Sequence, residues 1–262
     1  MYMPYRFNSA ICLLIKDENE YINEWLDWHT GAGFEHFYIY DNGSKIPIRE
    51  SVDKRYLPYC TFIDYSSGYE SLQIDCYNHA LLNYGKYTKW LAFIDTDEFI
   101  RTIDGSNIND FLADFDEFDG IFVRWIMYNA NGLRHKDNRP QRERFTQVST
   151  YDEWKPHGKS IVQPARICAM GPHFPTGIVG KMNMVDGCKQ RMRTPVSPFS
   201  TESKIVIDHY FTRSLDEWQE KKSRGSCDPR VERNYDEFYL YNPDMAKYAE
   251  DCDLMLDDSR LG

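Results

Sequence analysis

Short apolar runs alternate with apolar positions at helical spacing over the first hundred residues of the chain. The run Trp90-Leu91-Ala92-Phe93-Ile94 is uninterrupted, as in a strand that is buried on both faces of a sheet. The predicted strands lie at 11–15, 34–40, 60–65 and 90–94. One predicted helix carries Ile22, Trp25, Leu26 and His29 on one face and ends at Gly31 and Gly33, and a second spans 70–85. Such alternation predicts an α/β fold with a central, mainly parallel, mixed sheet flanked by helices.

The pattern continues more weakly after residue 100. A helix at 107–115 with Asn107 as its N-cap and a strand at 120–127 are predicted. Residues 129–200 are rich in turn signals and basic side chains, which indicates a loop-rich, substrate-facing surface or simply solvated loops. The last predicted elements are a strand at 204–207, a helix at 215–222 with a Ser214–Glu217 capping box, and an acidic helix at 244–258.

Polar residues follow three of the predicted strands directly. Lys16, Asp41 and Asp95 each come at a strand end, and parallel strands bring such ends to one edge of the sheet. Open α/β sheets bind nucleotides at that edge. The sequence has no Gly-x-Gly-x-x-Gly and no Gly-x-x-x-x-Gly-Lys-Ser/Thr, which disfavours a Rossmann dinucleotide site and a P-loop.

The stretch Asp95-Thr96-Asp97-Glu98 places three carboxylates after the strand at 90–94. In an extended turn, the side chains of Asp95 and Asp97 point to the same side. Two such oxygen donors suit Mg²⁺ or Mn²⁺, which usually keeps substrate phosphates as further ligands. The alternative interpretation is an acidic turn that caps the next segment.

Composition limits the classes of partner. The chain has 262 residues, 42% hydrophobic residues and a net charge of −10, so a folded core is expected and nucleic acid is disfavoured. Its seven cysteines are scattered singly, which argues against a zinc site and fits a reducing compartment. No secretory signal and no membrane-spanning run are recognised, so a cytoplasmic protein with at most peripheral membrane contact is expected.

Several motifs together resemble the GT-A glycosyltransferases, and most closely their family-2-like and family-92-like members. The resemblance lies in their order and spacing over residues 10–225. The motifs are Lys16-Asp17-Glu18-Asn19, Glu20 to His29, Asp41-Asn42-Gly43-Ser44, Gln73, Tyr77 to Leu81, Phe93 to Phe99, Glu143-Arg144-Phe145, Lys159-Ser160-Ile161 with Pro164, Asp208 to Phe211 and Lys221 to Gly225.

The resemblance implies a metal-dependent transferase that uses a nucleotide sugar, with Mn²⁺ or Mg²⁺ and a UDP-sugar. It places Lys16, Glu18, Asp41 and Asp95 at the donor and Asp95 and Asp97 around the metal. A late histidine closes the metal shell in such enzymes, and His209 matches it best, with His173 as the rival.

The catalytic base is not singled out by the sequence. The resemblance implies inversion, which requires one general base on the acceptor hydroxyl. A carboxylate does this well, and the candidates are Glu143, Asp152 and Glu153. Glu143 is favoured because it lies in a matching stretch, although it could instead pair with Arg142 or Arg144.

The resemblance predicts one domain over residues 1–262, with a nucleotide-sugar half at 1–128, an acceptor side at 129–225 and a helical tail at 226–262. Transfer of a hexose, with galactose as the first choice, to a glycan in polysaccharide biosynthesis is the expected reaction. A silent carbohydrate-binding or assembly module on the same fold is the alternative. A phosphatase with an Asp-x-Asp motif fits less well. Its motif strand normally comes first in the chain, whereas here it is the fourth, and its motif has Thr or Val two residues after the second Asp, where this sequence has Phe99.

Overall fold

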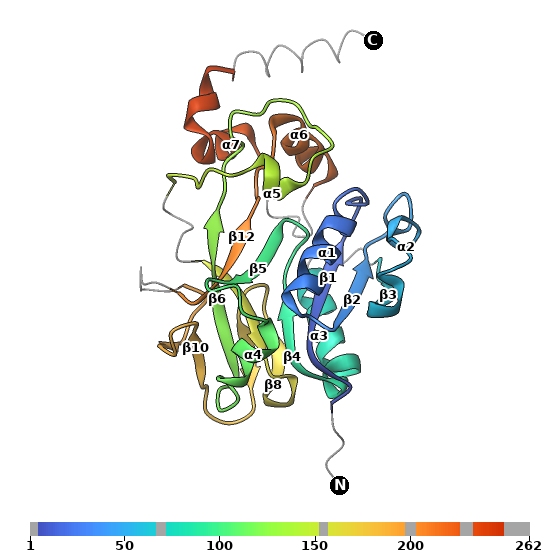
Figure 1. Cartoon of the computed structure of the whole chain (residues 1–262), viewed down its shortest axis with the longest axis vertical. Coiled ribbons are helices and arrows are strands. Elements are labelled where there is room, and N and C mark those ends of the chain that lie inside the picture. Colours follow the sequence, from blue (N-terminus) through green and yellow to red (C-terminus); the bar gives the residue numbers. More distant parts are fainter. Residues whose placement is uncertain (1–4, 67–71, 152–156, 197–202, 226–232, 249–262) are drawn as a thin grey trace. The chain divides into compact units, whose positions relative to one another are not determined.

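The computed structural model describes residues 5–66, 72–151, 157–196, 203–225 and 233–248 (Figure 1). The chain divides into two compact units, the first formed by Met1–Ile126 with Trp154–His209 and the second by Met127–Glu153 with Tyr210–Gly262.

The strands are β1 (Phe7–Ile15), β2 (His36–Asp41), β3 (Cys60–Asp64), β4 (Thr88–Phe93), β5 (Glu98–Thr102), β6 (Gly120–Met127), β7 (Gly158–Val162), β8 (Ile167–Met170), β9 (Pro175–Ile178), β10 (Met184–Asp186), β11 (Arg191–Met192) and β12 (Ile205–His209). The helices are α1 (Ile22–Ala32), α2 (Ile48–Ser51), α3 (Leu72–Tyr84), α4 (Ile108–Ala113), α5 (Gln141–Arg144), α6 (Leu215–Arg224) and α7 (Tyr235–Tyr241). Short 3-10 turns are η1 (Leu57–Tyr59), η2 (Gly85–Tyr87), η3 (Pro164–Arg166) and η4 (Pro243–Tyr248).

The central sheet is mixed, and its strands run in the order β11-β10-β6-β7-β4-β1-β2-β3, with β12 and β5 joined to it beside β6. β4, β1, β2 and β3 are parallel, whereas β7 lies antiparallel between β4 and β6. Gly158 permits this insertion, because a Cβ there would lie 2.0 Å from the carbonyl oxygen of Val123 on β6. The predicted mixed, mainly parallel sheet with flanking helices is confirmed.

Helices α1 and α3 cover opposite faces of this sheet. Trp25 of α1 packs against Phe37, whereas Tyr77 of α3 belongs to the cluster that contains Tyr38 and Tyr40. Successive strand residues point to opposite faces, so these contacts place the two helices on the two sides of β2. The runs predicted at 11–15 and 90–94 are buried in the same sheet, apart from the half-buried Leu14.

Most predicted elements are present, with shifted ends. Gly33 ends α1 in the left-handed conformation at φ 103°, Asn107 caps α4, and Ser214 with Glu217 forms the predicted capping box of α6. The prediction of loops over 129–200 was too coarse, because β7 to β11 and α5 form there. Their runs of two to five residues alternate with Gly and Pro and carry no clear period. Of the helix predicted at 244–258, residues 249–258 lie outside the described part of the chain.

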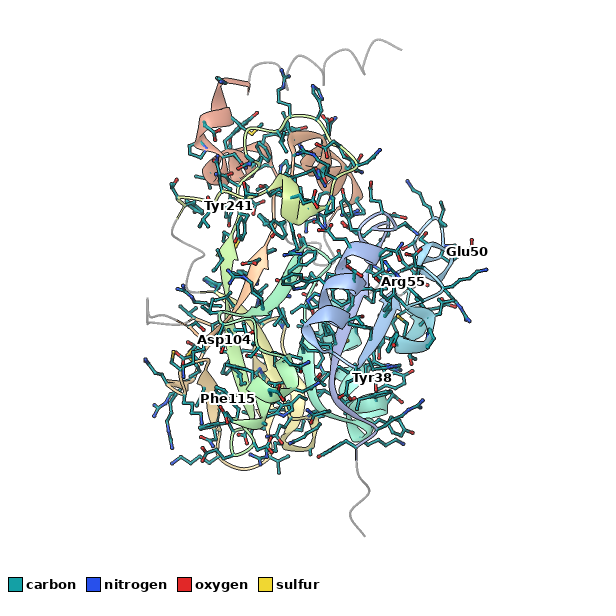
Figure 2. The ribbon with its side chains drawn as sticks, viewed as in Figure 1. Tyr38, Glu50, Arg55, Asp104, Phe115 and Tyr241 are labelled. Atoms are coloured by element: carbon teal, nitrogen blue, oxygen red, sulfur yellow. The ribbon has the colours of Figure 1, made fainter. Side chains whose placement is uncertain are left out.

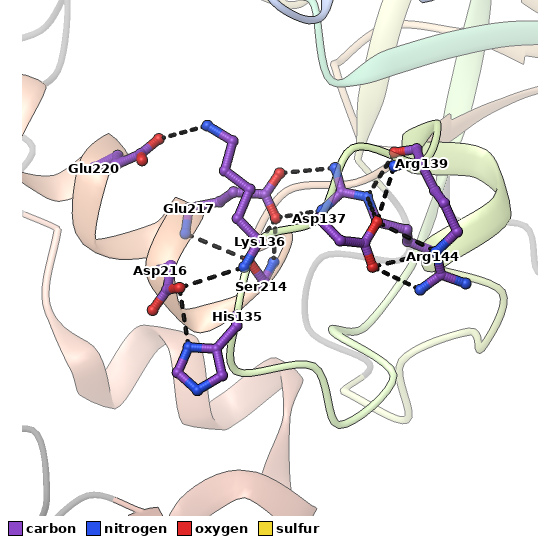
Figure 3. Close-up of polar contacts among 9 residues, drawn as sticks. All are labelled: His135, Lys136, Asp137, Arg139, Arg144, Ser214, Asp216, Glu217 and Glu220. Carbon is purple, nitrogen blue, oxygen red and sulfur yellow. Dashed lines mark hydrogen bonds and ion pairs between the residues drawn. The ribbon is translucent and has the colours of Figure 1, made fainter.

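The second unit is built around one buried ion pair (Figure 3). Arg144 of α5 donates two hydrogen bonds to Glu217 of α6, at 2.7 and 2.9 Å, and both side chains are only 1% exposed. Glu217 also accepts from the backbone N–H and the hydroxyl of Ser214, and the Nε of Arg144 donates to the carbonyl of Arg139. This pair joins the segment that contains α5 to the start of α6.

Within the described residues, no helix is both long enough and apolar enough to cross a membrane. The predicted functional division at 128 and 225 stays a prediction.

Candidate functional site

The Asp-x-Asp stretch forms the turn between β4 and β5, and α1 holds it in place. The indole N–H of Trp25 donates to the carbonyl oxygens of Asp95 and Glu98, at 3.0 and 3.1 Å. His29 accepts the backbone N–H of Ile100 at 3.2 Å through Nε2, so its proton lies on Nδ1, which faces the carbonyl of Trp25. The aromatic face of α1 is therefore a scaffold for the acidic turn.

Lys159 of β7 provides a buried positive charge beside this turn. Its Nζ lies 2.9 Å from Oδ2 of Asp95 and 4.0 Å from Oε2 of Glu98, and its side chain is 2% exposed. Burial works against its charge, but Asp95 and Glu98 outweigh that effect and raise its pKa above the usual value. Oδ1 of Asp95 accepts a longer hydrogen bond from Gln73, at 3.3 Å. Asp95 is thus oriented by a permanent cation and remains 35% exposed.

Glu98 has a strongly perturbed carboxyl group. Its side chain is fully buried, and this burial raises its pKa to about 8 against the opposing effect of Lys159, with Asp95 and Asp97 raising it further. Oε2 accepts the backbone N–H of Asp95 at 2.9 Å, whereas Oε1 has no hydrogen-bond partner among the described residues. A carboxyl group in this position is expected to carry a proton at neutral pH.

Asp97 and His209 lie side by side at the same end of the sheet. Oδ1 of Asp97 is 3.6 Å from Nε2 of His209, and both side chains are almost fully buried. His209 is the last residue of β12 and pairs with Glu98 of β5, so the strand predicted at 204–207 extends as far as the histidine itself. The ring of Trp125 packs against His209 with a centroid separation of 4.6 Å and fixes its plane.

His173 contacts the same tryptophan but has a different environment. Its Nδ1 lies 3.0 Å from the carbonyl oxygen of Gly158, to which it donates, and its ring meets Trp125 edge-on at 5.3 Å. Burial lowers its pKa to about 4, assisted by the nearby charge of Lys159, so it is neutral at physiological pH. Its hydrogen bond to Gly158 places it beside β7, within the electrostatic influence of Lys159.

The predicted donor residues on the first two loops meet at the expected edge. β1 and β2 are parallel with Ile15 opposite Asp41, and Lys16 follows as an exposed residue. Both carboxylate oxygens of Asp41 accept backbone N–H groups of its own loop, from Ser44 and Ile48, each at 2.9 Å. Asp41 therefore shapes the loop, and a nucleotide contact by Asp41 or by the buried Glu18 stays a prediction.

The candidate bases are not tested by the described residues. Glu143 lies exposed on α5 in the second unit, and its neighbour Arg144 binds Glu217 instead of Glu143. Asp152 and Glu153 lie outside the described part of the chain.

No group of three or more His, Cys, Asp or Glu side chains is arranged as a ready metal site within the described residues. Asp97 and His209 nevertheless supply one oxygen and one nitrogen donor, 3.6 Å apart. Neighbouring ligands that each lie about 2.1 Å from an octahedral ion are about 3 Å apart, so this pair fits two positions of one shell. Because the other ligands would come from substrate phosphates and water, the donor set fits Mn²⁺ or Mg²⁺.

Two residues that shape the site were not singled out as site residues from the sequence. Lys159 stood in a matched motif, but a lysine within a loop-rich basic segment carries no signal of burial. The sequence assigned Trp25 to an apolar helix face. Its role in the site depends on its indole N–H, which donates to the carbonyl oxygens of Asp95 and Glu98. The combination of Trp25, Trp28 and His29 on one helix was the available signal, because three polar aromatic groups on one face require partners.

Comparison with known proteins finds a family match over most of the chain. Residues 8–242 match the profile of glycosyltransferase family 92. A family 92 protein of Ricinus communis is 29% identical over 94 residues, which are 36% of this chain and 16% of that protein. One of Oryza sativa subsp. japonica is 24% identical over 108 residues, 41% of this chain and 18% of that protein. The matched stretch thus spans less than a fifth of the length of these relatives.

Solved structures show a more distant likeness. Residues 1–349 of TarS of S. aureus, in complex with UDP, align over 60% of this chain and 47% of that fragment, with 16% identity and a TM-score of 0.41. HddC of Yersinia pseudotuberculosis aligns over 68% of this chain and 90% of its own, with 10% identity and a TM-score of 0.39. The family profile covers most of the chain, and on that match the chain belongs to glycosyltransferase family 92.

Proposed function

We propose that this chain is a metal-dependent glycosyltransferase that moves a hexose, with galactose as the first choice, from a UDP-sugar to a glycan acceptor with inversion. The proposal rests chiefly on one observation, the pairing of Asp97 with His209 beside an Asp95 that is already neutralised by Lys159. The cytoplasm is the proposed location, because the scattered single cysteines fit a reducing compartment.

Asp97 and His209 would hold the divalent ion. When bound, the ion neutralises charge that develops on the diphosphate leaving group as the glycosidic bond breaks. His209 is favoured over His173 because only His209 has its ring nitrogen next to an Asp-x-Asp carboxylate, whereas Nδ1 of His173 binds Gly158.

Asp95 would act on the sugar side of the donor. Its charge is balanced by Lys159, so it is better suited to accept hydrogen bonds from ribose or sugar hydroxyls than to bind the ion. Lys16, Glu18 and Asp41 would line the nucleotide end of the same sheet edge. Lys159 holds Asp95 in position and, being buried, does not reach the donor itself.

Transfer requires one proton to move. The acceptor oxygen forms a bond to the anomeric carbon while the bond from that carbon to the diphosphate breaks, and a base takes the hydroxyl proton. Glu143 remains the proposed base, with Asp152 and Glu153 as the alternatives.

Purified protein should be incubated with a panel of nucleotide sugars and glycan acceptors, with Mn²⁺ and with a chelator, and scored for donor binding and for release of nucleoside diphosphate. We expect release from a UDP-sugar with Mn²⁺ only. Donor binding without turnover for every donor and acceptor would favour the silent carbohydrate-binding module, and no donor binding at all would contradict the proposal.

The metal assignment has its own test. His209→Ala should weaken both Mn²⁺ affinity, measured directly by calorimetry with UDP, and turnover, whereas His173→Ala should leave Mn²⁺ affinity near wild type. The reverse result would move the ligand role to His173.

A further inference from the structure

A hollow of the first unit lies between α1, β5 and the segment that follows β5. Its volume is about 490 Å³, within the range of small-molecule sites, about 300–1,000 Å³. The loop that carries Asp104, labelled in Figure 2, forms one wall through its neighbours Ile103 and Gly105. Among the described residues, none of the predicted donor or metal residues lines this hollow, so it is separate from the Asp-x-Asp site.

Trp28 gives the hollow a flat apolar wall. Its indole N–H donates to the carbonyl oxygen of Ile100 at 2.8 Å, which ties the polar edge of the ring to β5. The ring is half-buried, and part of its hydrocarbon surface lines the hollow together with the exposed Ile103. A tryptophan whose polar edge is tied down and whose ring surface remains accessible presents a rigid platform to a ligand.

Polar groups border this platform on two sides. The carboxylate of Asp27 is 67% exposed and is oriented by the hydroxyl of Tyr56 at 2.5 Å and by Arg55 at 3.7 Å. The opposite side has Ser106, whose backbone is held by Asp104 at 3.0 Å and by the hydroxyl of Thr102 at 2.8 Å. Asp27 offers an acceptor, and so does the Ser106 hydroxyl, whose own proton is directed to Asp104.

The charges around the hollow exclude an anionic ligand. Its one lining cation, Arg101, makes two hydrogen bonds to Asp208, at 2.7 and 3.1 Å, so its charge is already balanced. At the rim, Asp27 and Asp53 share the single cation Arg55, each at 3.7 Å, so the carboxylates outnumber the cation there. A nucleotide or a phosphate would therefore meet a surface with an excess of negative charge, whereas a neutral ligand pays no such cost.

We propose that this hollow is a carbohydrate-binding subsite that holds a neutral pyranose unit of a glycan. A pyranose has one apolar face of C–H groups, which the Trp28 ring would cover, and equatorial hydroxyls that Asp27 and Ser106 would bind. The hollow opens to the surface at Gly31, Ile103 and Gly105, so a longer chain can extend from it. Taking that glycan as the acceptor rests on the proposed function, but the binding of the sugar does not.

Gly31 allows the subsite to be closed without disturbing the backbone. It lies in α1 with helical backbone geometry, and a Cβ there would meet no atom within 4 Å. Gly31→Phe places a ring in the hollow, whereas Gly31→Ala leaves it open and is the matched control. Trp28→Leu removes the platform from a different position.

The test is saturation-transfer NMR with the methyl glycosides of glucose, galactose, mannose and N-acetylglucosamine, in the absence of UDP and metal. Wild type and Gly31→Ala should bind at least one of them, Gly31→Phe and Trp28→Leu should lose at least about tenfold in affinity, and glucuronate should not bind. Saturating UDP with Mn²⁺ should not displace the glycoside.

Each contrary result overturns the subsite. If Gly31→Phe, shown to be folded by circular dichroism, binds as well as Gly31→Ala, the sugar lies elsewhere. If no glycoside binds the wild type, or if glucuronate binds better than the neutral sugars, the assigned ligand class is wrong. Loss of UDP binding would leave these outcomes unchanged and would instead count against the donor site.

Discussion

Two buried ion pairs, one in each unit, differ in how completely their hydrogen-bonding groups are satisfied. Arg144 and Glu217 are joined by two hydrogen bonds, both are 1% exposed, and Ser214 and Arg139 satisfy further atoms of the pair. Lys159 makes one short contact to Asp95, which stays 35% exposed, while Oε1 of the buried Glu98 has no hydrogen-bond partner among the described residues. The first pair is saturated by its own unit, whereas the second leaves part of Asp95 exposed.

This difference separates a structural pair from a functional one. Buried charges are costly unless they are paired and hydrogen-bonded, so a saturated pair gives order to its surroundings and has little capacity left for a ligand. An incompletely satisfied pair at a strand end keeps acceptors directed towards a ligand and shifts the pKa of its neighbours. The predictions below exploit this contrast.

Arg144→Met should give the largest loss of stability. It leaves the carboxylate of Glu217 buried without its cation, which costs about 3–5 kcal/mol in such pairs. Equilibrium denaturation in urea measures this loss. The double variant Arg144→Met/Glu217→Met should recover most of it, and a single variant that loses under about 1 kcal/mol would refute the structural role of the pair.

Lys159→Met should lower stability only slightly but should weaken UDP binding strongly. We expect a loss of only about 1–2 kcal/mol in unfolding free energy, since Asp95 is partly solvated and Glu98 can keep a proton. Metal-dependent UDP affinity should fall at least about tenfold, because Asp95 loses its orientation and its charge is no longer balanced. Lys89→Met is the matched control, because Lys89 pairs with Asp116 on the surface at 2.7 Å. Equal UDP affinities in the two variants would contradict the positioning role of Lys159.

The sequence predicted the elements with strong periods and failed where tertiary contacts decide. The runs at 11–15 and 90–94 and the capping box at Ser214 were readable, because burial on both faces and local hydrogen bonding leave direct patterns. The sequence did not predict β7. A lysine breaks its apolar pattern, and Lys159 is buried there only because Asp95 faces it. The pairing of Asp97 with His209 was anticipated from the family resemblance, but its geometry depends on the register of β12 against β5.

Glu98 should make the free energy of unfolding depend on pH, because its pKa differs between the folded and unfolded states. Its folded-state pKa of about 8 lies above the unfolded value of 4.5, so the folded state binds more protons between these pH values. Its stabilising contribution is therefore fully present below pH 4.5 and is lost as the pH rises towards 8.

The variant Glu98→Gln mimics the protonated acid and should remove this loss. The measurement is the difference in melting temperature between wild type and variant from pH 4.5 to 8, which cancels the contribution of other groups, including the opposite one of His173. If the difference in melting temperature does not change between pH 4.5 and 8, Glu98 is ionised over this whole range in the folded protein, which contradicts its raised pKa.

Ser214→Ala should have the smallest effect. It removes one hydroxyl from the saturated pair and breaks the capping box of α6, which costs about 1 kcal/mol. The expected drop in denaturation midpoint is small, and Mn²⁺ binding in the presence of UDP should stay at the wild-type value. A large loss of Mn²⁺ affinity would mean that the structural pair also serves the donor site.

Calorimetric titration of UDP, with Mn²⁺ and with a chelator, compares wild type with Asp97→Asn. The amide keeps the shape of Asp97 but lacks the charge that holds an ion, and Lys89→Met serves as the surface control. Wild type should bind UDP at least about tenfold more tightly with Mn²⁺, and Asp97→Asn should abolish most of that difference. Equal UDP affinity with and without Mn²⁺ in the wild type, or an unchanged metal dependence in Asp97→Asn, would contradict the metal site at Asp97 and His209.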